Sequence, residues 1–126
     1  MKNPTKRNTE EDLLERNVQI AVAALEDIKG KDITVIDVAK LSPLFERMII
    51  ASGDSSRQVK ALADNVREKL KEAGVEIIGT EGAAGTDWVL VDAGSLIVHV
   101  MHPTVRAYYN LEELWGAAQK ARSAAA

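Results

Sequence analysis

The fold is decided by residues 87–115, whose sequence is DWVLVDAGSLIVHVMHPTVRAYYNLEELW. Residues 88–91 and 96–101 are mostly apolar, and the tight turn DAGS at residues 92–95 joins them, which predicts a β-hairpin. Residues 103–115 open with a proline, which ends the second strand and begins a helical region. Both histidines, both tryptophans and both tyrosines lie in this stretch, which makes it the candidate functional region.

Capping residues and apolar spacing predict two further helices. Thr9 can cap the first, with Asp12 at its third position, and apolar residues then recur at helical spacing until a glycine ends the run. Ser55 and Gln58 form a second capping box before a helix with one apolar face, which also ends at a glycine.

Three more strands are predicted, at residues 34–38, 47–52 and 75–78, and a glycine-rich loop is predicted at residues 79–86. The element order is therefore α-β-β-α-β-β-β-α. Strands on either side of the central helix indicate one parallel connection, whereas the hairpin is antiparallel. The predicted fold class is α/β, a mixed β-sheet of about five strands with helices packed on it.

The chain has 126 residues, 46% of them hydrophobic, which fits one globular domain. We expect a flexible N-terminal arm at residues 1–8, a single α/β domain at residues 9–115 and an alanine-rich tail at residues 116–126. No signal peptide or transmembrane helix is expected, and the absence of cysteine fits a reducing compartment. A cytoplasmic protein with no membrane partner is therefore predicted.

Charge is distributed unevenly along the chain. Residues 75–115 carry six acidic side chains and one basic side chain, Arg106, for a net charge of −5, whereas acids and bases balance over residues 1–74. The formal net charge of −3 argues against general binding to a phosphate backbone, so no sequence-specific nucleic-acid binding is expected. An acidic, aromatic segment on an otherwise neutral domain favours a basic protein partner.

A phosphate-binding loop is one reading of residues 53–57, GDSSR, because they lie between a buried strand and a capped helix. The loop matches neither the Walker pattern nor the dinucleotide fingerprint. A nucleotidyltransferase would also need paired carboxylates on the next strand to hold magnesium, and residues 75–78 have no acidic pair. A simple helix N-cap is the favoured interpretation.

Catalytic and metal-binding residues are not expected. His99 and His102 are spaced H-x-x-H, but a strand does not place both rings on one face, and no third ligand is evident. Asp87 and Asp92 bracket one strand about 16 Å apart, which is too far for paired acid–base work. We therefore predict no catalytic residue, no cofactor and no metal site.

Trp88 and Leu90 share the outer face of their strand if Val89 and Val91 face the core, and His99 and Met101 are their cross-strand neighbours. This composition is typical of a binding surface. The alternative is that a helix from residues 104–115 covers the face and makes it core; the pattern leaves both open. The predicted partner-binding residues are Trp88, Leu90, Asp92, His99, Met101, Tyr109 and Trp115.

Six segments together resemble a known family: ASGDSSRQV (51–59), ALADNV (61–66), EG (81–82), WVLVD (88–92), VHVM (98–101) and RAYYNLEELW (106–115). Their order and spacing are similar to those of the ribosomal silencing factors (RsfS, also called Iojap), over about two-thirds of the chain. The resemblance implies a nucleotidyltransferase-like shape without the catalytic carboxylates.

The resemblance also implies a function. It implies binding to the large ribosomal subunit through ribosomal protein L-fourteen, steric blocking of subunit association, and repression of translation and of ribosome biogenesis under nutrient limitation. A homodimer is implied as well. Two alternatives are a nucleotidyltransferase-like enzyme that uses residues 53–56 and a plain homodimerisation module.

The sequence departs from the pattern of this family in two places. Glu46 and Arg47 stand where the family usually has Asp-Tyr, and Ser95 stands where an acidic residue is frequent in the hairpin turn. Both departures could change partner affinity or dimer contacts, and neither interrupts the core pattern.

Overall fold

A computed structural model describes residues 6–82 and 86–115 of the chain. Its elements follow the predicted order around one five-stranded sheet. They are α1 (Lys6–Asp27), β1 (Lys31–Asp37), β2 (Arg47–Ser52), α2 (Ser56–Glu72), β3 (Gly79–Glu81), β4 (Trp88–Asp92), β5 (Leu96–Met101) and α3 (Pro103–Tyr109). Residues 111–115 are helical again after a break at Asn110. The α/β class with a mixed sheet is confirmed.

The strands lie in the order β1-β2-β5-β4-β3. Only β2 and β5 pair in parallel, and the other three pairs are antiparallel. The sequence predicted one parallel connection across the central helix, between the strands before and after it. The strand that pairs in parallel with β2 is instead β5, which comes later in the chain than the strand directly after α2. The hairpin β4–β5 therefore supplies the centre of the sheet as well as its candidate site.

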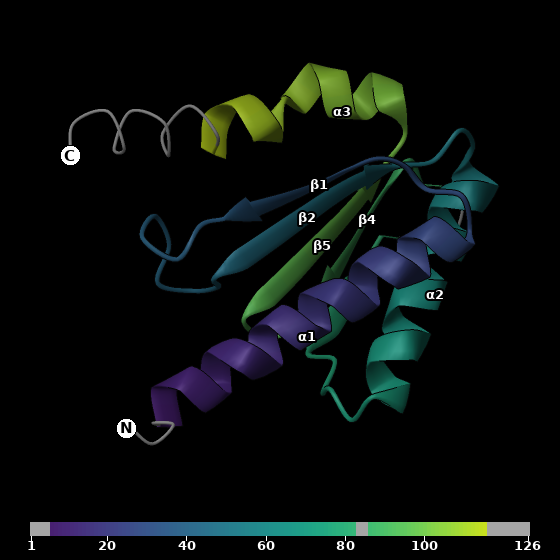
Figure 1. The fold of residues 1–126 in the computed structure, drawn as a ribbon. Coiled ribbons are helices and arrows are strands. Elements are labelled where there is room, and N and C mark those ends of the chain that lie inside the picture. The colour runs from purple at the N-terminus through teal and green to yellow at the C-terminus, as the bar shows by residue number, and fades with distance from the viewer. Residues whose placement is uncertain (1–5, 83–85, 116–126) are drawn as a thin grey trace.

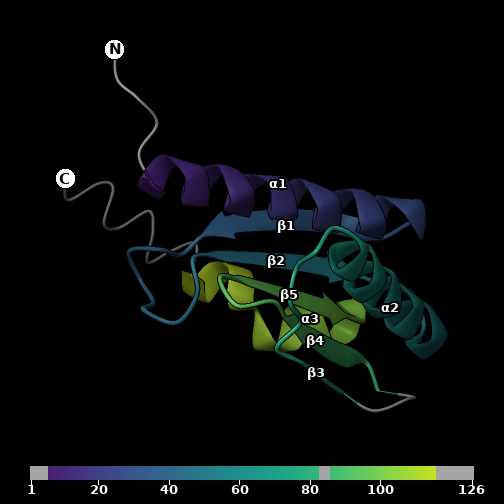
Figure 2. The same cartoon turned by 90° about the horizontal axis from the view of Figure 1, so that it is seen from below.

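Helices cover both faces of the sheet (Figure 1). The helices α1 and α2 lie on one face, and Figure 2 shows α1 running alongside β1. Their apolar side chains form the main core with Ile49, Val91 and Val98. On the opposite face α3 and residues 111–115 cover a smaller core built from Ile50 and Met101. No helix of the described residues is long and apolar enough to cross a membrane.

The first helix begins earlier than its sequence predicted. It starts at Lys6, so Thr9 lies inside α1 and is not its N-cap, and three residues of the predicted flexible arm are helical. Residues 1–5 of that arm and the predicted tail at residues 116–126 lie outside the described residues.

The third strand was also predicted in the wrong place. Residues 75–78 are unpaired along most of their length, although Val75 and Ile77 pack on the main core. The strand is β3, in the stretch predicted as a glycine-rich loop, where Gly79 pairs with Asp92 and Glu81 with Leu90. An edge strand needs backbone pairing with one neighbour and few apolar side chains, so its pattern is weak in the sequence.

Candidate partner-binding groove

Strand alternation on the hairpin places four candidate side chains on the α3 side of the sheet. Leu90 lies directly opposite His99, and Trp88 lies opposite Met101, so these residues share one face as predicted. Val89 and Val91 point to the other face and are buried in the main core.

An open groove of about 280 Å³ lies between this face and the helical residues 111–115. We call it the aromatic groove, and its lining is almost entirely apolar: Phe45, Met48, Trp88, Leu90, Ile97, His99, Leu111 and Trp115. A second hollow of about 350 Å³ continues from Trp88, Leu90 and His99 toward Glu81 and Thr86. The two hollows share three side chains and so form one continuous surface.

The side chains of Trp88 and His99 are hydrogen-bonded to each other at the centre of this surface. The indole Nε1 of Trp88 donates a hydrogen bond to Nδ1 of His99 at 3.0 Å, which requires a ring that is unprotonated at that nitrogen. Burial lowers the pKa of His99 from its ordinary 6.5 to about 4, because the charged ring would lose its water. His99 is therefore neutral near pH 7 and orients Trp88.

Aromatic rings extend the surface along α3. The ring of Tyr109 lies 4.8 Å from that of Trp88, and Tyr108 packs edge-on against Tyr109 at 5.0 Å. Both tyrosines are exposed, Tyr108 by 79%. At the other end of the aromatic groove, Phe45 and Trp115 pack at 6.0 Å. Rigid, exposed rings of this kind are enriched among the anchor residues of protein interfaces.

Two predicted site residues, Met101 and Asp92, are not openly exposed on this surface. Met101 is fully buried in the smaller core, because α3 begins two residues later and folds back over the end of β5. Its assignment to the exposed surface was wrong. Asp92 shares the face of Leu90 but lies half-buried at the hairpin turn, where its carboxylate accepts a hydrogen bond from the backbone of Gly94 at 2.9 Å.

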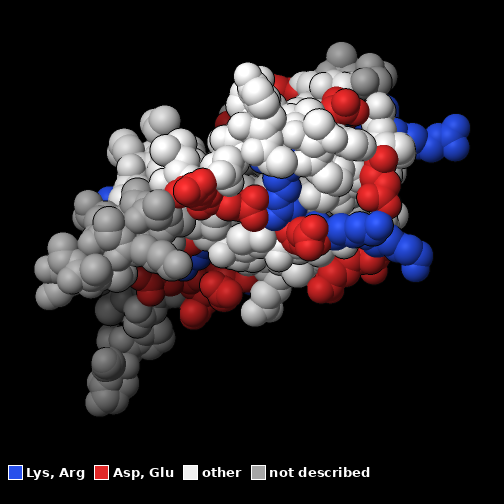
Figure 3. Space-filling model, turned by 90° about the horizontal axis from the view of Figure 1, so that it is seen from above, with Lys and Arg blue, Asp and Glu red and all other residues white. Residues whose placement is uncertain are grey.

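The sequence left open whether helices cover this face of the sheet. They cover one part of it and leave another part open. The helices bury Met101 and Ile50, whereas Trp88, Leu90 and His99 remain half-buried along the aromatic groove. Figure 3 shows this side of the molecule, with a broad uncharged area and both acidic and basic side chains around it.

Neither histidine is arranged as one of a cluster of metal ligands. Nδ1 of His99 accepts from Trp88, and Nδ1 of His102 accepts from the backbone N–H of Thr104 at 3.2 Å, so His102 is the N-cap of α3. Within residues 6–82 and 86–115, no three His, Cys, Asp or Glu side chains gather closely enough to hold a metal ion.

The loop at residues 53–57 is built as a helix start. Ser55 caps α2 by accepting from the N–H of Gln58 at 3.1 Å, which confirms the predicted cap, and Gln58 in turn accepts from the N–H of Asp54 at 2.7 Å. The carboxylate of Asp54 pairs with Lys31 at 2.7 Å. The N–H groups of Asp54 and Gln58 are thus engaged within the protein, beside a carboxylate that would repel a phosphate.

The residues that depart from the family pattern lie at the start of β2 and in the hairpin turn. Arg47 is paired with Asp37 of β1 at 3.2 Å, and Glu46 is exposed. The backbone oxygen of Ser95 accepts from the N–H groups of both Glu46 and Arg47. None of these side chains lines the aromatic groove.

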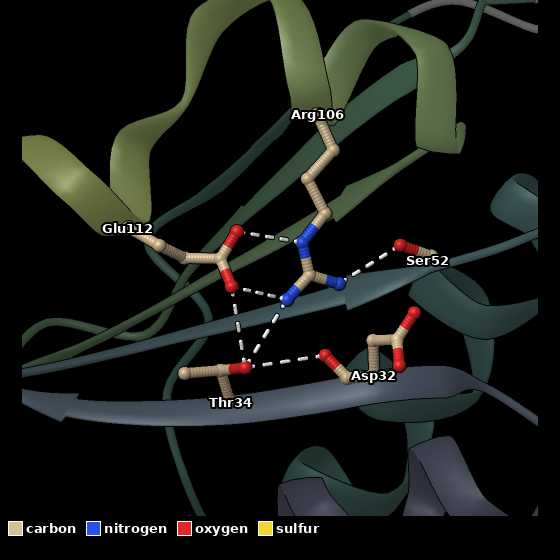
Figure 4. A network of polar contacts seen from close by, with 5 residues as sticks. All are labelled: Asp32, Thr34, Ser52, Arg106 and Glu112. Atoms are coloured by element: carbon tan, nitrogen blue, oxygen red, sulfur yellow. Dashed lines mark hydrogen bonds and ion pairs between the residues drawn. The ribbon is translucent and has the colours of Figure 1, made fainter.

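Sequence reasoning missed the role of Arg106, which it treated only as a surface charge. The residue is 8% exposed, and its side chain reaches from α3 down to the sheet (Figure 4). The guanidinium donates twice to Glu112, at 2.8 and 2.7 Å, and also to Ser52 at 2.8 Å and to Thr34 at 3.1 Å. Arg106 cancels the charge of Glu112, so the acidity of the surface comes from other carboxylates.

We therefore class the chain as a mixed α/β domain with a candidate protein-binding groove. The family model described as "Ribosomal silencing factor during starvation" matches residues 10–125. The chain belongs to the ribosomal silencing factor (RsfS) family, whose members regulate translation at the ribosome.

Individual relatives agree with this assignment. The ribosomal silencing factor RsfS of Chromobacterium violaceum is 63% identical over 98 residues, which are 78% of this chain and 80% of that protein. The Haemophilus influenzae factor of the same name is 45% identical over 98 residues, 78% of this chain and 96% of that protein. A crystal structure of a C. violaceum protein, 61% identical, superposes with a TM-score of 0.79 over 81% of this chain and 85% of that chain.

The structure changes what truncation of Trp88 is expected to do. Because the indole packs on the smaller core and binds His99, Trp88→Ala should lower the free energy of unfolding by about 2 kcal/mol, less than for a fully buried tryptophan. It should also weaken partner binding more than about tenfold. Val89→Ala, on the other face, should lower stability alone. Urea denaturation measures the free energy of unfolding, and titration with the partner measures the affinity. Unchanged affinity in Trp88→Ala would show that Trp88 does not lie in the interface.

Proposed function

We propose that this protein binds the large ribosomal subunit through ribosomal protein L-fourteen, using the aromatic groove and the exposed rings beside it. While the protein is bound to the large subunit, the small subunit cannot associate with it. Translation is thereby repressed under nutrient limitation. The observation that carries the proposal is a continuous apolar surface on an RsfS-family fold, with Trp88, Leu90 and Tyr109 presented on rigid elements.

Charge supports a basic partner over a second copy of this chain. Glu81 lines the second hollow, Asp87 is exposed beside Trp88, and Glu113 is exposed next to the wall of the aromatic groove. Two such acidic faces would repel each other in a homodimer, whereas ribosomal proteins are generally basic. We therefore propose the ribosomal protein as the occupant of the aromatic groove, with homodimer formation through this face the weaker alternative.

We propose that the function involves no catalytic step, cofactor or metal, and that it takes place in the cytoplasm. The capped helix start at residues 53–57 and the capping role of His102 support this view, because Asp54, Ser55 and His102 make hydrogen bonds or ion pairs within the fold.

The test is a titration of purified L-fourteen with this protein, followed by subunit joining measured by light scattering. We expect one-to-one binding and inhibition of joining when the protein is added before the small subunit. The affinity should fall as salt rises from 0.1 to 1 M, where the Debye length shortens from about 10 to about 3 Å. Salt-independent binding would contradict the electrostatic part of the proposal, and joining at an undiminished rate on saturated subunits would contradict the blocking mechanism.

A further inference from the structure

We propose that Arg106 is a positioning residue for partner binding: it holds the helical residues 111–115 against the sheet, so that the aromatic groove is formed before the partner arrives. This inference rests on the proposed function, since it concerns the same surface. It adds a role for a side chain that lines neither hollow and lies beneath the surface.

The contacts of Arg106 join three parts of the chain that are far apart in sequence. Nε and Nη2 hold both carboxylate oxygens of Glu112, in the helical residues 111–115. Nη1 reaches Ser52 at the end of β2, and Nη2 also reaches Thr34 on β1. A planar guanidinium can make this set of bonds, and Figure 4 shows the side chain descending from α3 into the space between its partners.

The break at Asn110 separates the helical residues 111–115 from α3, so contacts with the sheet are needed to hold them in place. The preceding helix α3 has seven residues and ends at Asn110, which adopts a left-handed conformation with φ of 51°. This break stops helical hydrogen bonding from continuing smoothly into the next turn. A helix of seven residues such as α3 is marginal in water without tertiary contacts, so α3 alone does not fix the residues that follow it.

The tethered segment forms one wall of the aromatic groove. Leu111 and Trp115 lie on it and face Phe45 and the strands, while Glu112, between them in sequence, turns to Arg106. A segment held in its bound position loses less conformational entropy when a partner docks, so the affinity is higher than for a groove that must be ordered on binding.

A purely structural role would have a different signature. The same network could simply add to global stability, and then any equally destabilising change elsewhere would have the same effect on binding. A positioning role is local: it changes residues 111–115 and the affinity while the distant core stays intact. Val66, fully buried in α2 on the opposite face of the sheet, provides the matched comparison.

The experiment compares Arg106→Lys with Val66→Ala. Lysine keeps the charge but cannot hold both oxygens of Glu112 while reaching Ser52. In Arg106→Lys we expect amide hydrogen exchange at residues 111–115 to quicken at least about tenfold, exchange in α2 to stay as in the parent, and the affinity for L-fourteen to fall about tenfold. In Val66→Ala we expect lower thermal stability with unchanged affinity. If Arg106→Lys does not fold, Glu112→Gln replaces it, since it keeps the side-chain shape and weakens the same pair.

Two results would overturn the inference: unchanged exchange at residues 111–115 in the Arg106 variant, or an equal loss of affinity in both variants at matched stability. Failure of the proposed function is separate. If the parent protein does not bind L-fourteen at all, the partner is wrong, and the exchange measurement on the free protein still decides whether Arg106 holds the groove wall.

Discussion

Replacing Leu90 by lysine is expected to lower the affinity for L-fourteen by more than about 100-fold, equivalent to about 2.8 kcal/mol. Leu90 lines both hollows at the middle of β4, so the new ammonium group would stand at the centre of the apolar surface and face a basic partner. A charge that loses its water without a counter-ion, next to like charges, opposes binding by several kcal/mol.

The same change should leave the fold intact. Leu90 is only half-buried, and a lysine stem can lie on the neighbouring rings while its charge remains in water, so we expect the free energy of unfolding to fall by about 1 kcal/mol or less. The matched control is Leu13→Lys on α1, where the leucine is 50% exposed on the other side of the sheet. A Leu90→Lys protein that binds as tightly as the Leu13→Lys control would show that the partner does not use the aromatic groove.

The second large effect is a loss of stability in mild acid, caused by His99. The pKa of His99 is lowered from 6.5 to about 4 by burial, so between these values the unfolded chain binds a proton that the folded chain excludes. Stability is therefore complete above pH 6.5, falls as the pH falls to about 4, and changes little below that for this group. We expect a loss of about 1–3 kcal/mol over the window, since the half-buried ring keeps some contact with water.

Urea denaturation between pH 7 and pH 5 measures the upper part of this loss in the parent and in two variants. His99→Gln should flatten the dependence, whereas His102→Asn, which keeps an acceptor at the cap of α3, should retain it. Glu112 does not interfere: its hydrogen bonds to Arg106 lower its pKa below 4.5, so its contribution is present above that pH and is lost only below it. An unaltered slope in His99→Gln would assign the acid sensitivity to another group.

The hairpin was predictable because its signals are local. Alternating apolar residues and a turn with Gly94 set β4, β5 and their register, and the register alone puts Trp88, Leu90 and His99 on one face. The cap of α2 at Ser55 was predictable for the same reason. Each of these features depends on residues within a few positions of one another.

The missed features depend on distant parts of the chain. The position of β3 is set by pairing with β4, and Gly82 is needed there because a Cβ atom would lie 2.7 Å from the backbone oxygen of Trp88. The burial of Met101 depends on where α3 folds back, and the network of Arg106 joins Thr34 and Ser52 across more than fifty residues. The one sequence signal for Arg106 was its position as the single base in an acidic segment.

Site-specific photo-crosslinking to isolated large subunits tests most directly whether the aromatic groove binds ribosomal protein L-fourteen. A photoreactive amino acid replaces Tyr109, which is 53% exposed and packs against Trp88 at the rim of the aromatic groove, or Leu13 on α1 in a second preparation. We expect a cross-link from position 109 to ribosomal protein L-fourteen and none to that protein from position 13. A cross-link to L-fourteen from position 13 alone, or from position 109 only to other components of the subunit, would contradict binding through the aromatic groove.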